Sequence, residues 1–145
     1  ATIVDDYAHH PTAVRATIAA ARRCHRGELV VAFQPHRYTR TAFLAREFAD
    51  ALRDADRVYL APVYAASEPA IPGVSERSIG EALAEMGAPV EYVADLQQLE
   101  DRLFAEPAPG AMILMLGAGN ITDVAARLAE RVAATAERRT ASVQA

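Results

Sequence analysis

Short apolar runs alternate along the chain with longer stretches in which apolar residues recur every three or four positions. The short runs predict β-strands, and the continuously apolar ones predict strands that are buried on both faces, as in a parallel sheet. We expect five strands, over Thr2–Asp5, Leu29–Phe33, Arg57–Ala61, Val90–Val93 and Met112–Leu116.

The stretches between these runs have the spacing of amphipathic helices. The first has a proline in its first turn and a glycine, Gly27, placed to end it. Two others open with Ser78–Glu81 and Asp95–Gln98, which resemble capping boxes. We expect helices to start near Pro11, Thr41, Ser78, Asp95 and Ile121.

This alternation predicts an α/β fold: a Rossmann-like, doubly wound, mainly parallel sheet of about five strands flanked by helices. Such sheets bind ligands in the crevice beyond the carboxyl ends of their strands. Residues 1–139 form one predicted domain without an internal repeat, and residues 140–145 lack periodicity and are predicted to fray.

Composition narrows the choice of function. The 145 residues are 52% apolar, and 15 basic against 19 acidic residues give a net charge of −4, which argues against nucleic acid as a partner. The single cysteine, Cys24, and the lack of a long apolar stretch predict a soluble cytoplasmic protein without a membrane span. All basic residues are arginine, so this chain alone offers no lysine for a phosphate loop or a Schiff base. Because the chain starts without methionine, we expect it to be a piece of a longer protein.

Unusual polar residues follow four of the five predicted strands. The segments are 5–11, 34–40, 62–68 and 117–120, and they hold three of the four histidines. Because the carboxyl ends of parallel strands meet at one edge of a sheet, these segments are predicted to form a site there.

Several of these residues have more than one interpretation. Asp5 or Asp6 is suited to capping the first helix, and His9 with His10 is suited to an ordinary turn before Pro11. A zinc site is disfavoured because no third ligand stands at metal spacing. Arg37 and Arg40 also have an ordinary interpretation, because arginines are usually solvated surface charges.

The spacing of Arg37 and Arg40, three residues apart at a strand-to-helix turn, predicts instead that both guanidinium groups bind one carboxylate or phosphate. Gly117-Ala118-Gly119 is a weak dinucleotide signature, because Thr122 stands where the third glycine belongs. A tight turn that needs glycine is the favoured interpretation, with Asn120 as a cap of the last helix.

Four motifs together resemble the carboxyl-terminal domain of the Mur ligase family, in order and over essentially the whole chain. The first two are specific, whereas the last two mean little alone. They are Val4–Thr12, Phe33–Thr41, Val63–Ala66 with Ile71–Val74, and Gly117–Ile121.

The resemblance implies an ATP-dependent ligase of peptidoglycan synthesis that adds L-alanine to UDP-N-acetylmuramate through an acyl phosphate. It implies ATP and Mg²⁺ as cofactors, with amino-terminal and central ATPase domains as partners, and the magnesium ligands outside this chain. Those two domains are absent from this sequence, so no catalytic residue is expected here in isolation, and we expect the isolated chain to be inactive.

The resemblance also assigns residues. Asp6 matches a position near the nucleotide. A second group matches positions around the incoming amino acid, in which the arginines would hold the carboxylate and the histidines would orient the amine. These residues are Tyr7, His9, His36, Arg37 and Arg40, with His10 as a less certain neighbour.

Two alternatives stay open at this stage. A ligase that recycles murein peptides shares the first motif, but the stretch Pro35–Arg40 favours the alanine-adding type. A stand-alone Rossmann-like nucleotide-binding module or dehydrogenase needs a glycine loop after the first strand and an acidic residue at the end of the second. Gln34 stands at that second position.

Overall fold

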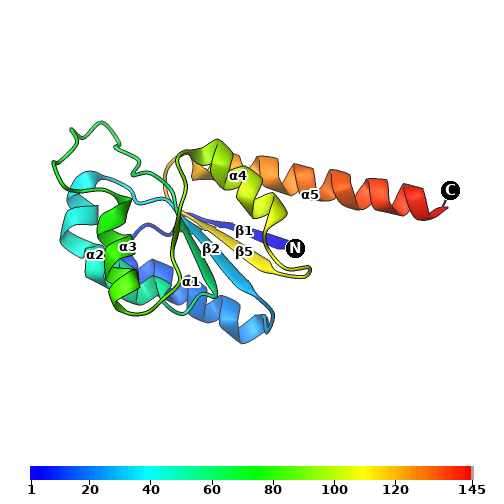
Figure 1. The fold of residues 1–145 in the computed structure, drawn as a ribbon, viewed down its shortest axis with the longest axis horizontal. Helices are drawn as coiled ribbons and strands as arrows, with labels where there is room; N and C mark the ends of the chain where they lie inside the picture. The colour runs from blue at the N-terminus through cyan, green and yellow to red at the C-terminus, as the bar shows by residue number, and fades with distance from the viewer. Residues whose placement is uncertain (145) are drawn as a thin grey trace.

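The computed structural model describes residues 1–144 and confirms the predicted α/β architecture (Figure 1). Within these residues five strands form one sheet in the order β1-β5-β2-β3-β4, and every neighbouring pair is parallel. The strands are β1 (Thr2–Asp6), β2 (Leu29–Phe33), β3 (Arg57–Leu60), β4 (Glu91–Tyr92) and β5 (Met112–Leu116). The helices are α1 (Pro11–Cys24), α2 (Tyr38–Leu52), α3 (Glu76–Glu85), α4 (Leu96–Ala105) and α5 (Ile121–Gln144).

The helices divide between the two faces of the sheet. Helices α1, α2 and α3 pack together on one face and α4 and α5 on the other, as Figure 1 shows. This division follows from the strand order: α1, α2 and α3 lead across the sheet in one direction, and α4 returns in the opposite one. With right-handed crossovers, the reversal places the returning helix on the other face.

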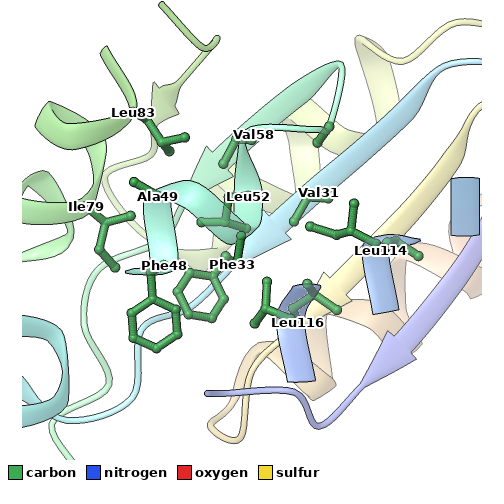
Figure 2. Packing of buried hydrophobic residues seen from close by; sticks show 14 of the residues in the cluster. Val31, Phe33, Phe48, Ala49, Leu52, Val58, Ile79, Leu83, Leu114 and Leu116 are labelled. Atoms are coloured by element: carbon green, nitrogen blue, oxygen red, sulfur yellow. The ribbon is translucent and has the colours of Figure 1, made fainter. Parts of the chain in front are cut away.

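Strand β2 lies between β5 and β3 and is buried over its whole length. Its side chains alternate between the two cores. Val31 and Phe33 face the core with α1–α3, whereas Val30 and Ala32 face α4 and α5. In Figure 2 Phe33 meets Phe48 of α2, and their ring centroids lie 5.1 Å apart. Burying an aromatic or branched side chain of this kind contributes about 1.5–3 kcal/mol, so these two cores supply much of the fold's stability.

Several predicted element boundaries were wrong. Strand β1 ends one residue later than predicted, at Asp6, and β3 ends one residue earlier, at Leu60. Helix α2 begins at Tyr38 instead of Thr41, and α3 begins one turn early because Ser75 is its N-cap. The Ser75 side chain accepts from Arg77 N, and Ser78 accepts from Ser75 N to complete the capping box. Strand β4 is shorter than the predicted Val90–Val93, since this edge strand pairs with β3 only through its two residues. The predicted start of α4 is confirmed: Asp95 accepts from Gln98 N.

Residues 140–144, which were predicted to fray, lie at the end of helix α5 in the structure. Helix α5 continues through Gln144 and projects beyond the sheet (Figure 1). Its last residues are exposed, so the apolar periodicity that marks a packed helix is missing there. Alanine, arginine and glutamate are strong helix formers, which allows the helix to continue without a neighbour. Ala145, the last residue of the predicted tail, lies outside the described residues. A helix with the length and apolar character of a membrane span is not found among residues 1–144.

Candidate functional site at the carboxyl edge of the sheet

The loops after β1, β2 and β5 meet at the carboxyl edge of the sheet. Gln34 N donates to Leu116 O of β5, and Gly117 N donates to Asp6 O of β1. The helices that follow β2 and β5 lie on opposite faces, so their loops diverge at this edge, which is the position where open parallel sheets bind ligands. This is where the sequence predicted a site.

Gln34 fixes the loop after β5. Its side chain is 3% exposed. Its Nε2 donates to Asn120 Oδ1 at 2.8 Å, and its Oε1 accepts from Ile121 N at 3.2 Å. Asn120 stands directly before α5, as a cap residue does, and its Oδ1 accepts from Gln34, while Gln34 Oε1 accepts from the first amide of that helix.

The glycine turn after β5 has the structural role that the sequence favoured. Gly117 has a φ of 154°, which side chains rarely adopt. A Cβ on Gly119 would lie 2.6 Å from Gln34 Oε1 and 2.7 Å from the ring of Tyr64. The two glycines therefore let the loop pass close to Gln34 and Tyr64.

The loop after β3 joins the site through a short continuation of the sheet. His36 and Tyr64 form a parallel β-bridge. Tyr64 N donates to Pro35 O at 2.8 Å, and Arg37 N donates to Tyr64 O at 2.8 Å. Tyr64 lies in the segment 62–68 that was predicted to reach this edge, but it was not among the individually predicted site residues. The single tyrosine in the short stretch after a buried strand is the sequence signal that could have revealed it.

Four rings from three loops form a row across the edge. Tyr7 meets His9 edge-on with centroids 5.0 Å apart, and His9 meets His36 edge-on at 5.6 Å. His36 stacks on Tyr64 at 5.4 Å with an interplanar angle of 22°. Tyr7 is 70% exposed, so one end of the row is open to solvent. The structure thus brings together three of the predicted residues, Tyr7, His9 and His36.

Arg40 lies against His36 on the first turns of α2. Its Nη1 is 3.2 Å from His36 Nδ1 and 3.3 Å from His36 O. Burial lowers the pKa of His36, and the charges of Arg40, His9 and Arg37 lower it further, whereas Glu68 opposes the shift. The His36 imidazole is therefore held neutral beside two permanent cations.

Arg37 itself is exposed and is the N-cap residue of α2, with a left-handed φ of 72°. Next to it, Glu68 accepts from Thr39 N at 3.1 Å and from Thr39 Oγ1 at 2.6 Å. These hydrogen bonds, led by that of the Thr39 hydroxyl, lower the pKa of Glu68, and the charge of Arg37 adds to the effect. The carboxylate thus ties the loop after β3 to the first turn of α2.

The two remaining predicted residues lie on the β1–α1 connection. Asp6 is half-buried: its Oδ1 accepts from Ala8 N at 2.9 Å and its Oδ2 from Thr17 Oγ1 at 3.1 Å. Asp6 therefore fastens the loop instead of capping α1. His10 is the N-cap residue of α1, without a side-chain capping bond, and is exposed.

A pocket of about 280 Å³ opens beside Tyr64, between the loops after β3 and β5 and the start of α4. Gln34, Asn120 and Asp95 supply its polar groups. Within residues 1–144 no three side chains of His, Cys, Asp or Glu gather into a group that could hold a metal ion.

Comparison with known proteins agrees with this geometry. Residues 1–119 match the family model described as Mur ligase, glutamate ligase domain. The chain is 49% identical over 127 residues to a UDP-N-acetylmuramate–L-alanine ligase from Acidithiobacillus ferrooxidans, which covers 87% of this chain and 27% of that protein. It is 47% identical over 128 residues to the ligase of the same name from Carboxydothermus hydrogenoformans, covering 88% of this chain and 28% of that protein.

A solved structure gives the same result. The UDP-N-acetylmuramate–alanine ligase from Thermotoga maritima matches with a TM-score of 0.73 at 30% identity, over 92% of this chain and 27% of that one. The chain thus spans about a quarter of the length of the relatives that it matches. It belongs to the Mur ligase family, and it corresponds to the carboxyl-terminal domain of those ligases.

Proposed function

We propose that this chain is the amino-acid-binding domain of an ATP-dependent ligase that joins L-alanine to UDP-N-acetylmuramate in peptidoglycan synthesis. The names of relatives that are 43% to 49% identical support this reaction. The observation that carries the proposal is the placement of Arg37 and Arg40 around a neutral His36 at the crevice of the sheet.

The two arginines are suited to the carboxylate of the incoming amino acid. A guanidinium group offers several donors in a fixed plane, and a charge-assisted hydrogen bond to a carboxylate is about twice as strong as a neutral one. Arg40 is held by His36, whereas Arg37 is exposed at the start of α2. Binding the carboxylate there would place the amino acid beside His9 and His36, with Tyr7 at the open end and His10 nearby.

Asp6 is our candidate contact to the nucleotide. Each of its oxygens accepts one hydrogen bond within the domain, which leaves lone pairs for a ribose hydroxyl. The phosphate loop and the Mg²⁺ ligands would come from the central domain, because this chain has no lysine for such a loop and no metal cluster in residues 1–144. The amino-terminal domain would hold the UDP-sugar in the same cytoplasmic enzyme, and the isolated chain would be inactive.

A chimera tests the proposal. The matching segment of the Acidithiobacillus ferrooxidans ligase is replaced by this chain, and phosphate release is measured with ATP, Mg²⁺, UDP-N-acetylmuramate and L-alanine. We expect release that depends on L-alanine from the chimera and none from the isolated chain. A folded chimera without L-alanine-dependent release would refute the proposed reaction, and turnover by the isolated chain would refute its dependence on the other domains.

A matched pair of variants tests the arginine role in that chimera. Arg40→Gln is expected to raise the KM for L-alanine about 10- to 100-fold, because a hydrogen bond to a charged group contributes about 1.5–3 kcal/mol. Arg46→Gln is the control. Arg46 lies on the same helix, is exposed and only approaches Glu85 at 3.9 Å. Equal KM values in the two variants would contradict the assignment.

A further inference from the structure

His9 and His36 lie edge-on in the same row, but each uses its Nδ1 in a different way. His9 Nδ1 lies 2.9 Å from the backbone oxygen of Tyr7. A carbonyl oxygen only accepts, so the hydrogen bond requires a proton on His9 Nδ1. In the neutral ring the lone pair then lies on Nε2, on the other side of the imidazole.

His36 has the opposite arrangement. Its Nδ1 lies 3.2 Å from Arg40 Nη1, and a guanidinium group only donates. The Nδ1 of His36 must therefore carry the lone pair, and Nε2 carries the proton. Burial and the neighbouring cations lower the pKa of His36, which favours this neutral form. In the described residues 1–144, neither Nε2 has a protein hydrogen-bond partner.

We infer that the two histidines have different chemical roles: His9 Nε2 accepts the proton of the incoming α-ammonium group, and His36 Nε2–H donates a hydrogen bond to the bound substrate. This inference rests on the proposed ligase function and deepens it. The lone pair on His36 Nδ1 is occupied by Arg40, so that ring has no free acceptor for an ammonium proton. His9 has one.

The reaction needs such an acceptor because an ammonium nitrogen has no lone pair with which to attack. One N–H bond breaks and its proton moves to His9 Nε2, leaving a neutral amine. The amine nitrogen attacks the carbonyl carbon of the acyl phosphate, so the C–N bond forms and the C–O bond to the phosphate breaks. Phosphate leaves with the electron pair and takes the second proton lost by the nitrogen.

The groups around His9 are compatible with this division. Its ring faces Tyr7 on its own loop and His36 from the loop after β2. Arg40 and Arg37 act on His36, where they oppose a second positive charge. The carboxylate of Asp6, two residues before Ala8 on the same loop, is engaged by Ala8 N and Thr17. The free acceptor on His9 Nε2 and the occupied Nδ1 of His36 therefore carry the division of roles.

Imidazole ¹⁵N NMR on the 145-residue chain tests the assignment without any activity. At neutral pH we expect the Nδ1–H tautomer for His9 and the Nε2–H tautomer for His36. His25 is the internal control, since its Nε2 lies 3.2 Å from Glu28 O and should carry a proton. His9 in the Nε2–H form, or His36 in the Nδ1–H form, would overturn the inference.

Variants in the chimera test the consequence for catalysis. His9→Ala should lower kcat about 100-fold or more, the usual contribution of a positioned base, and added imidazole should restore part of it. His36→Gln keeps an N–H donor, so it should mainly raise the KM for L-alanine and should not respond to imidazole. His25→Gln, away from the site, should behave like the parent chimera.

The outcomes separate the two proposals. Imidazole rescue of His36→Ala but not of His9→Ala, or an unchanged kcat in His9→Ala, would refute the role of His9. A parent chimera that never shows L-alanine-dependent release would refute the proposed function, while the NMR tautomers would still decide how the two histidines differ. Thermal unfolding of each variant identifies any loss that comes from misfolding.

Discussion

Replacing Gln34 should both destabilise the fold and release the loop after β5. Gln34→Ala leaves the buried amide of Ile121 without its acceptor, which costs about 1–3 kcal/mol. It also removes side-chain packing from a residue that is only 3% exposed, worth about 0.8 kcal/mol per buried methylene group. We therefore expect a loss of about 2–4 kcal/mol.

For a chain of this length, 1 kcal/mol corresponds to a change of about 3 °C in Tm, so the expected fall is about 6–12 °C. Thermal and urea unfolding followed by circular dichroism measure it. Gln34→Met keeps most of the side-chain volume but removes both hydrogen bonds, so it should still lower the free energy of unfolding by about 1–3 kcal/mol. Gln97→Ala, on the exposed side of α4, is the matched control and should change stability by less than about 0.5 kcal/mol.

Hydrogen exchange locates the effect. The Ile121 amide should be protected from exchange in the parent chain and should exchange much faster in Gln34→Met. The exchange of the β2 amides should speed up only by the factor that the loss of global stability accounts for. If both Gln34 variants match the parent chain within 0.5 kcal/mol, the hydrogen bonds to Asn120 and Ile121 do not hold the loop. The reasoning about this residue would then be wrong.

Three further predictions concern stability. Gly80→Ala should lower the free energy of unfolding, measured with urea, by about 1–3 kcal/mol, because the new Cβ would overlap the hydroxyl of Tyr92. In a Tyr92→Ala background the same substitution should raise the free energy of unfolding by up to about 1 kcal/mol, because alanine has the higher helix propensity. Burial alone would raise the pKa of Glu100, but the hydrogen bonds of Arg127 and Arg131 lower it overall. Glu100→Gln should therefore lower the free energy of unfolding by about 1–3 kcal/mol at pH 7. This loss should become smaller as the pH falls below 4.5, because the Glu100 carboxylate is then protonated in the parent chain as well. Burial is the main cause that lowers the pKa of His36, so the unfolded chain binds a proton at this residue more readily than the folded one. The parent chain should therefore lose more stability than His36→Gln when the pH falls from 7.5 to 5.5.

The controls differ among the three. For Gly80, stabilisation by alanine in the parent background would contradict the overlap with Tyr92. For Glu100, the exposed Glu130→Gln should be neutral at every pH, and a pH-independent loss in Glu100→Gln would exclude the ion pairs as its cause. For His36, equal pH dependence of the parent chain and the variant would contradict the lowered pKa.

The sequence alone predicted the type and order of the elements because apolar runs and helical spacing depend on burial, which dominates this fold. Capping was harder to predict. Ser75 and Ser78 stand three residues apart, and each is able to start a helix, so the local pattern favoured the later one. The long exposed end of α5 carries no apolar periodicity, and helix propensity alone does not mark where such a helix ends.

The convergence of the loops that form the candidate site was predictable for a different reason. Parallel strands bring their carboxyl ends to one edge, so residues after β1, β2, β3 and β5 had to meet. Which side chains touch was not predictable. The Gln34–Asn120 bond joins residues 86 positions apart, and the stack of His36 on Tyr64 depends on a bridge between two loops. Spacing predicted that Arg37 and Arg40 share an anion, but only the folded structure brings Arg40 against His36.

Arg37 shows best how folding and function separate at this edge. It adopts a φ of 72° with a ψ of 139°, a conformation that costs an ordinary side chain about 1–3 kcal/mol and that glycine would adopt more easily. The surroundings impose it: Arg37 N donates to Tyr64 O, and Arg37 O accepts from both Thr41 N and Thr41 Oγ1. Strain of this kind persists only where neighbouring contacts fix it, and it gathers at functional sites. The hydrogen bonds that fix this turn use the backbone atoms of Arg37 and not its guanidinium group, so the choice of arginine at this position agrees with the proposed binding of a carboxylate.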